Sequence, residues 1–411
     1  MTGHVSFHAW RGPELAGGLH LGTTVDGTGL RLTTPVGTRR YVDPHRVTGP
    51  GEHVWAAWVS PAVTPGHRFT SLVPSWNATT PGDSWLEVEV RASGDGIGWT
   101  RWFTLGRWAS TTETVAPTSV PGQACDQGQV DTDELLARGG VTWSTYQLRL
   151  VLHRGPTSDA VPTVTLVGAV VAHPGEHRAG VSPLRQAQGT ANSATRDGST
   201  TRDGVELAVP PYSQQLHRGT GADDGSDGGG ESWCSPTATA MVLGYWGRTP
   251  PEDEPTTIAA ELPDPAVEHA ARHVQDHAYG AGNWSFNTAY AARHGLEAFV
   301  TRLRSLDEAE LFVRAGIPLV ASLSFRGDEL DGAGYDTSGH LLTVIGFDAA
   351  GDVVCNDPAS HQLPSNDEVR VVYDRKQLET AWLDGSGGLV YVIRPPDVRL
   401  PSPAVPHEPN W

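Results

Sequence analysis

The sequence has little lysine, little cysteine and no long apolar segment. Lys376 is the only lysine among 29 basic side chains, which we interpret as coding bias rather than chemistry. Three cysteines, Cys125, Cys234 and Cys355, are too few and odd in number for a disulfide framework, so at least one thiol is free. No stretch approaches the roughly 18 apolar residues of a membrane span. These absences predict a protein without a membrane partner and with a thiol available for chemistry.

The amino-terminal stretch, MTGHVSFHAWRG, also lacks the charged and apolar regions of a signal peptide. As printed, the sequence therefore predicts a cytoplasmic protein. A start codon further upstream would predict a secreted one instead.

Negative charge is concentrated in the second half of the chain. The net charge is -18; residues 1–190 carry 15 acidic and 14 basic side chains, and residues 191–411 carry 32 and 15. Nucleic acids and anionic membranes need a basic face, so we expect neither as a partner. The acidic half is a weak indication of basic substrates.

At 411 residues the chain is long enough for two domains. Residues 1–175 contain short segments with alternating apolar and polar side chains, such as WLEVEVRAS (85–93) and YQLRLVLH (146–153). A period of two is typical of half-buried antiparallel strands, and many such strands with turn signals favour a β-sandwich or jelly roll. Residues 176–204 are polar and aperiodic, which predicts a linker.

Nine of the 14 tryptophans lie in residues 1–175. One interpretation is a face that stacks on sugar rings and binds glycan or cell wall. The simpler interpretation, which we prefer for most of them, is that they fill the core of the predicted sandwich.

The most informative stretch is ESWCSPTATAMVLGYWG (231–247), where Cys234 precedes an apolar pattern with helical spacing. Proline at position 236 is tolerated in the first turn of a helix. We therefore expect Cys234 at a helix start, where backbone N–H groups and the helix dipole favour a thiolate. Cys355, in an apolar segment, is expected to serve packing, and Cys125 to lie in a surface loop.

A second informative stretch, HLLTVIGFDAAGDVVCNDPAS (340–360), predicts a β-hairpin. With the turn centred on DAAG, the numbers of opposite residues sum to about 699. Asp357 is then one diagonal step from His340, and such neighbours lie about 7 Å apart. The hairpin thus brings together an imidazole base and a carboxylate to orient it. Asn356 remains an alternative partner for His340, because adjacent strand residues face opposite ways and the sequence does not fix which of the two faces the imidazole.

A reactive cysteine with an imidazole base and a carboxylate predicts a hydrolase with a cysteine nucleophile. Such an enzyme also needs hydrogen-bond donors for the oxyanion of its intermediate. The backbone N–H of Cys234 is one, and Gln214 or Gln215, at the end of a predicted short strand, is the second.

These motifs resemble the papain-like cysteine peptidases, and more narrowly the C39-like branch of the family that processes double-glycine leaders. The matching segments are PPYSQ (Gln214), WCSPTATAMVLGYWG (Cys234), GHLLTVIGFD (His340) and NDPA (Asp357). The resemblance implies an α+β protein with a papain-like domain at residues 205–395, followed by a tail at 396–411. The β-rich residues 1–175 resemble, more loosely, the accessory domain of two-domain members.

The resemblance implies a cysteine peptidase acting on a peptide or protein. It assigns Cys234 as nucleophile, His340 as base, Asp357 as orienter and Gln214 as oxyanion donor. We expect the substrate to contact Trp233, Ser235, Trp284 and Asn287. No cofactor or metal is expected, since the spaced histidines at 269, 273 and 277 are better explained as a solvated helix face.

Two alternatives remain from the sequence. Ser235 stands where the family usually has glycine, so the second domain could be an inactive peptidase fold attached to a glycan- or wall-binding domain. The same residues could also transfer the acyl group to an amine instead of water.

Overall fold

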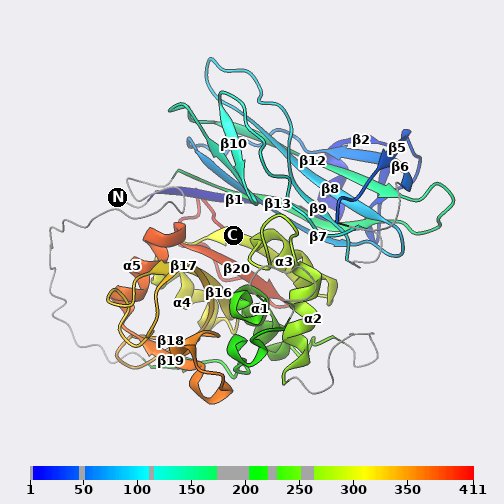
Figure 1. The fold of residues 1–411 in the computed structure, drawn as a ribbon. Coiled ribbons are helices and arrows are strands. Elements are labelled where there is room, and N and C mark those ends of the chain that lie inside the picture. Colours follow the sequence, from blue (N-terminus) through cyan, green and yellow to red (C-terminus); the bar gives the residue numbers. More distant parts are fainter. Residues whose placement is uncertain (1–2, 46–50, 111–114, 174–202, 221–228, 251–262) are drawn as a thin grey trace.

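The computed structural model describes residues 3–45, 51–110, 115–173, 203–220, 229–250 and 263–411. The chain is an α+β protein whose described sheets are antiparallel. Figure 1 shows the N-terminal strands, in blue to cyan, above the C-terminal part, in green to red. Except for residues 203 and 204, the predicted linker lies outside the described residues. None of the described helices is long and apolar enough to cross a membrane.

The N-terminal part consists of two antiparallel sheets that enclose one core. The first has the order β10-β11-β7-β13-β4-β3, with β1 also paired to β13, and the second has the order β2-β6-β12-β8-β9, with β5 paired to β6. The strands are β1 (His4–Arg11), β2 (Leu19–Leu21), β3 (Thr23–Asp26), β4 (Gly29–Leu32), β5 (Gly37–Tyr41), β6 (Gly51–Val59), β7 (Ser71–Thr79), β8 (Trp85–Ser93), β9 (Phe103–Trp108), β10 (Gly128–Asp131), β11 (Glu134–Ala137), β12 (Thr145–Arg154) and β13 (Thr163–His173), with a 3₁₀ helix at Gly12–Gly17.

Most tryptophans of this part are in its core. Trp10, Trp58, Trp76, Trp85, Trp108 and Trp143 are buried. Trp99 is exposed and Trp102 is partly buried, but the guanidinium of Arg91 lies 4.5 Å from the centre of each ring. The guanidinium of Arg91 therefore occupies one face of each indole, where it makes a cation–π contact.

The C-terminal part is built on one sheet with the order β15-β20-β16-β17-β18-β19, with β14 paired to β17. Its strands are β14 (Val205–Glu206), β15 (Glu297–Arg302), β16 (Leu319–Phe325), β17 (Thr337–Phe347), β18 (Val353–Asn356), β19 (Arg370–Tyr373) and β20 (Leu389–Arg394). The helices are α1 (Cys234–Tyr245), α2 (Pro265–Val274), α3 (Trp284–Arg293), α4 (Leu306–Arg314) and α5 (Arg375–Ser386), with short 3₁₀ helices at Gln214–His217, Gly229–Ser232, Ser360–Gln362 and Asn366–Glu368.

The two parts meet along β15, the edge strand of the C-terminal sheet. Asn77 of β7 donates to the carbonyl of Ala298 (2.6 Å) and accepts from its N–H (3.1 Å). The hydroxyl of Ser75 accepts from the N–H of Val300 at 2.8 Å. Side chains from the N-terminal part thus take the place of a neighbouring strand, which satisfies backbone groups that an edge otherwise leaves unpaired.

Apolar packing and the C-terminal residues strengthen this junction. The ring of Phe286 packs against Trp76 and Trp108, whose centres lie 5.9 and 5.4 Å away. Asn410, which is buried, donates to the carbonyl of Arg302 at 2.8 Å. The expected tail is therefore part of the packed structure, and Figure 1 places the C-terminus between the two parts.

Candidate active site

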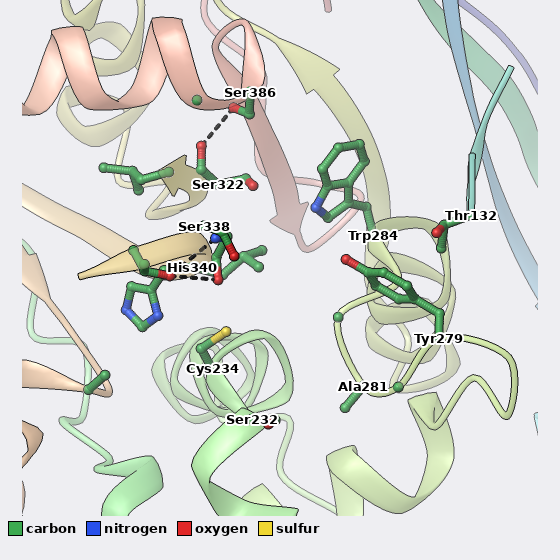
Figure 2. Close-up of a pocket in the computed structure, with 18 of the residues that line it drawn as sticks. Thr132, Ser232, Cys234, Tyr279, Ala281, Trp284, Ser322, Ser338, His340 and Ser386 are labelled. Atoms are coloured by element: carbon green, nitrogen blue, oxygen red, sulfur yellow. Dashed lines mark hydrogen bonds between the residues drawn. The ribbon is translucent and has the colours of Figure 1, made fainter. Parts of the chain in front are cut away.

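Cys234 is the first residue of α1 and is partly exposed to a cavity of about 780 Å³. Figure 2 shows its side chain turned into this cavity, near His340. Pro236 occupies the first turn of the helix, where the absence of an N–H costs nothing. The helix start predicted for Cys234 is therefore present, and the thiol lies at the positive end of the helix dipole.

His340 lies on β17 and meets Asp357, which directly follows β18. The ring Nε2 and the Oδ1 of Asp357 are 2.8 Å apart, and both residues are buried. Thr343 lies opposite Asn356, and Val344 opposite Cys355, which is the register expected from the turn. Asn356 faces away and donates to the carbonyl of Val209 at 3.0 Å. Of the two possible partners, only Asp357 contacts the imidazole.

The Asp357 carboxylate has a complete set of donors. Its Oδ2 accepts from the hydroxyls of Tyr335 (2.8 Å) and Tyr373 (2.7 Å), and its Oδ1 also accepts from the N–H of Ala359 (2.9 Å). A fully buried carboxylate needs such compensation to stay ionised. Sequence reasoning missed both tyrosines, because they lie on a loop and on β19, far from the motifs in sequence.

The electrostatics of the three groups favour an ion pair. Burial opposes the charged imidazolium, but the charge and hydrogen bond of Asp357, then those of Cys234, raise the pKa of His340 to about 10. Burial likewise opposes the thiolate, yet His340 and the N–H groups of Leu341 and Ser235 lower the pKa of Cys234. Both shifts favour a thiolate–imidazolium pair near neutral pH.

Gln214 lines the same cavity as Cys234. It lies in a 3₁₀ helix rather than at the end of a strand, which is a correction to the expected local structure. Its Nε2 donates to the carbonyl of Glu231 at 2.6 Å, which leaves a second N–H of the amide available. Gln215 also lines the cavity, but its Oε1 accepts from Arg218.

Of the four residues expected to contact substrate, Trp284 alone lines the cavity. Ser235 is fully buried, and its hydroxyl lies 2.8 Å from the hydroxyl of Tyr391. Trp233 is buried near His217. Asn287 is buried, and its amide donates to two backbone carbonyls. These three side chains are thus committed to packing or internal hydrogen bonds.

Among the described histidines and cysteines, only His340 and Cys234 line the cavity. His269 is buried, not solvated as expected, and its Nδ1 lies 2.7 Å from the hydroxyl of Tyr290. Cys355 is buried, and burial raises its pKa. Among the residues that the structure describes, no three His, Cys, Asp or Glu side chains are grouped to hold a metal.

Comparisons with known proteins identify two families of C39 peptidases. Residues 6–172 match the family described as peptidase C39 N-terminal domain, and residues 206–388 match the peptidase C39 like family. Among solved structures, a presumed C39-like peptidase from Bacillus anthracis is 18% identical, and the match covers 47% of this chain and 98% of that one with a TM-score of 0.30. That TM-score is too low to compare the two folds. No curated protein matches the chain.

Proposed function

Because this chain belongs to the two-domain family of C39-like peptidases, we propose that it is a cysteine peptidase with Cys234 as nucleophile, His340 as base and Asp357 as orienter. The observation that carries the proposal is the bond between His340 and Asp357, buried next to a partly exposed thiol of lowered pKa. This is the arrangement that activates a thiol and stabilises the imidazolium.

The proposed reaction begins with attack of the Cys234 thiolate on the carbonyl carbon of a peptide bond. The C=O electrons move to the oxygen, and the backbone N–H of Cys234 and the second amide N–H of Gln214 bind that oxyanion. His340 then gives its proton to the nitrogen of the leaving amine as the C–N bond breaks. A water molecule, deprotonated by His340, attacks the acyl-enzyme and releases the carboxylic acid and the free thiol.

We also infer a papain-like fold for residues 205–395 and a β-sandwich for residues 1–175, with a linker at 176–204 and, at 396–411, a tail that packs at the junction of the two parts. Helix α1, which carries the nucleophile, packs against β17, which carries the base. The two sheets of the N-terminal part share one buried core.

Two alternatives predict different products. An inactive peptidase fold with a glycan-binding first domain would leave Cys234 unreactive. This alternative requires that Ser235 blocks the cleft, but Ser235 does not line the cavity. An acyltransferase would use the same residues and give a new amide when an amine is added. Mass spectrometry of the products with and without added amine separates transfer from hydrolysis.

The proposal is tested with iodoacetamide and a mixed-sequence peptide library. We expect one rapidly labelled cysteine, Cys234, and cleaved peptides detectable by mass spectrometry. Cys234→Ala should lose both the labelling and the cleavage while keeping the unfolding transition of the wild type. Cys125→Ala is the matched control and should keep both. Cleavage by Cys234→Ala would overturn the assignment.

A further inference from the structure

The cavity beside Cys234 is completed by the N-terminal part of the chain. Strands β10 and β11 form an antiparallel hairpin, and its turn, residues 131–134, lines the cavity. Figure 2 shows Thr132 of this turn next to Tyr279, across the cavity from Cys234. The accessory part therefore supplies one wall of the cleft in which the proposed peptidase works.

Carboxyl groups dominate the charge of this cavity. Among the described residues, five with a carboxyl group line it: Asp131, Asp133, Glu134, Glu231 and Asp336. Arg302 is the one arginine of the described lining; it donates to Glu134 at 2.7 Å and also to the carbonyl of Ser386. Among the described residues, no arginine or lysine pairs with Asp131, Asp133 or Asp336. Burial raises the pKa of Asp133 to about 8, so this carboxyl is mostly uncharged near neutral pH. The excess negative charge of the cavity therefore comes from Asp131, Glu231 and Asp336.

Two aromatic rings lie beside the acidic turn. Tyr279 and Trp284 both line the cavity, and Tyr279 is 57% exposed. Their side chains face the cavity in Figure 2, on the side opposite Cys234. An aromatic face next to a carboxylate is a combination that binds ammonium and guanidinium groups.

Reciprocal hydrogen bonds fix this aromatic wall to the N-terminal part. Asp133 accepts from the N–H of Trp284 at 2.5 Å. In the other direction, Asp276 accepts from the N–H of Ser119 at 2.9 Å and from the N–H of Ala278 at 2.9 Å. The loop that carries Tyr279 is thereby held against the accessory part at both of its ends.

Two further observations link the acidic turn, residues 131–134, to the side of the cavity that holds Cys234. Partial burial, followed by the charges of Asp133, Cys234 and Asp131, raises the pKa of Tyr279 to about 12. The Tyr279 hydroxyl therefore interacts electrostatically both with the acidic turn and with Cys234. Gln214 is 3% exposed and lines the same cavity, and its Oε1 has no donor among the described residues. A buried acceptor without a partner indicates that a ligand N–H belongs there.

We propose that this cleft selects peptides with a lysine or arginine side chain next to the scissile bond, and that Asp131 of the accessory part, with Tyr279 and Trp284, binds that cationic group. The inference rests on the proposed peptidase function. It gives the N-terminal part a role in the choice of substrate rather than in attachment to a surface.

The test uses the full-length protein and matched peptides. The mixed-sequence library is digested first, and the cleaved peptides are sequenced by mass spectrometry. One cleaved sequence is then made with lysine, norleucine or glutamate at the enriched position. We expect kcat/KM to be about tenfold or more higher for lysine than for norleucine, lowest for glutamate, and the preference to shrink between low and high salt.

Asp131→Asn and Tyr279→Leu should each reduce the ratio of kcat/KM for lysine over norleucine at least threefold. Asp131 and Tyr279 are both exposed, so these variants should fold. Glu52→Gln, which removes an exposed acid on β6 outside the cavity, is the control and should leave the ratio unchanged.

The outcomes separate the two proposals. Absence of any cleavage by the wild type, with Cys234 unlabelled, would overturn the peptidase function. Cleavage with equal kcat/KM for lysine and norleucine, or a ratio that is the same in Asp131→Asn and Tyr279→Leu as in the wild type, would leave the peptidase standing and overturn the cationic selection.

Discussion

Asp357 binds His340 through the ring Nε2, at 2.8 Å, so the other ring nitrogen, Nδ1, is the one that faces Cys234. The carboxylate fixes which nitrogen carries the proton that the leaving amine receives. Because both residues are buried, water does not screen this interaction, and the carboxylate controls the pKa of the imidazole.

The pH dependence of activity should report this control. The proposed active form has a thiolate and an imidazolium, so kcat/KM should rise as the thiol ionises and fall as His340 loses its proton, at about pH 10. Asp357→Asn removes the charge that holds this pKa up, so the alkaline limb should move to lower pH and kcat should fall roughly 10²-fold. The measurement is kcat/KM from pH 5 to 11 with a cleaved library peptide. An alkaline limb that stays in place in Asp357→Asn would contradict the control by the carboxylate.

The tyrosines around Asp357 should contribute stability that depends on pH. Burial opposes ionisation of Asp357, but the charge and hydrogen bond of His340, then the hydroxyls of Tyr373 and Tyr335, lower its pKa. This contribution is therefore present above the unfolded pKa of about 4 and is lost as pH falls through the lowered value. Tyr373→Phe should reduce the free energy of unfolding by about 1–3 kcal/mol at pH 7 and by less at pH 3.

Denaturant unfolding at the two pH values checks this expectation. Tyr245→Phe is the matched control, because its hydroxyl donates to a neutral acceptor, the carbonyl of Gly316, at 3.0 Å. Its cost should be the same at both pH values. An equal cost of Tyr373→Phe at pH 3 and pH 7 would show that the charge of Asp357 is not what the hydroxyl stabilises.

Ser235 should matter for stability and not for turnover. Its hydroxyl bonds with that of Tyr391 inside the protein, away from the cavity. Ser235→Gly should keep kcat/KM within about threefold while it lowers the free energy of unfolding by about 1–3 kcal/mol, since it leaves a buried hydroxyl unpaired. Steady-state kinetics and urea unfolding measure the two effects. A tenfold gain in kcat/KM would mean that the serine obstructs the cleft after all.

The junction between the two parts should be sensitive at Asn77. Asn77→Ala leaves both the N–H and the C=O of Ala298 without their side-chain partner in a buried position. We expect a loss of about 2–4 kcal/mol in the free energy of unfolding. Thr79→Ala, at the exposed end of the same strand, should cost far less. Comparable losses in the two variants would indicate that the contact with Ala298 is not what holds β15.

Local patterns in the sequence were enough to predict much of the proposed site. Apolar spacing and Pro236 indicated a helix that begins at Cys234, and the DAAG turn indicated the register that brings His340 near Asp357. Only the structure shows that Asp357, and not Asn356, contacts His340. Asp357 lies just past the end of β18, where the alternation of strand side chains no longer applies.

Contacts between distant segments could not be predicted in this way. Nothing in the alternation of β10 and β11 indicates that their turn reaches the cavity of the other part. The orientation of Ser235 is set by Tyr391 on β20, which lies 156 positions away. The short strand expected to end at Gln214 is limited to Val205–Glu206, because β14 pairs with β17 at only two positions.

The way in which β15 is covered also has a consequence for how this protein can be made. A gene fragment encoding only the second half would produce a strand whose Ala298 and Val300 backbone groups have lost Asn77 and Ser75. Such a bare edge is a template on which another copy can add its own strand, and aggregation follows. The first half would therefore protect the edge of β15 from pairing with another copy. The shortest soluble fragment that retains Cys234 would have to include β7.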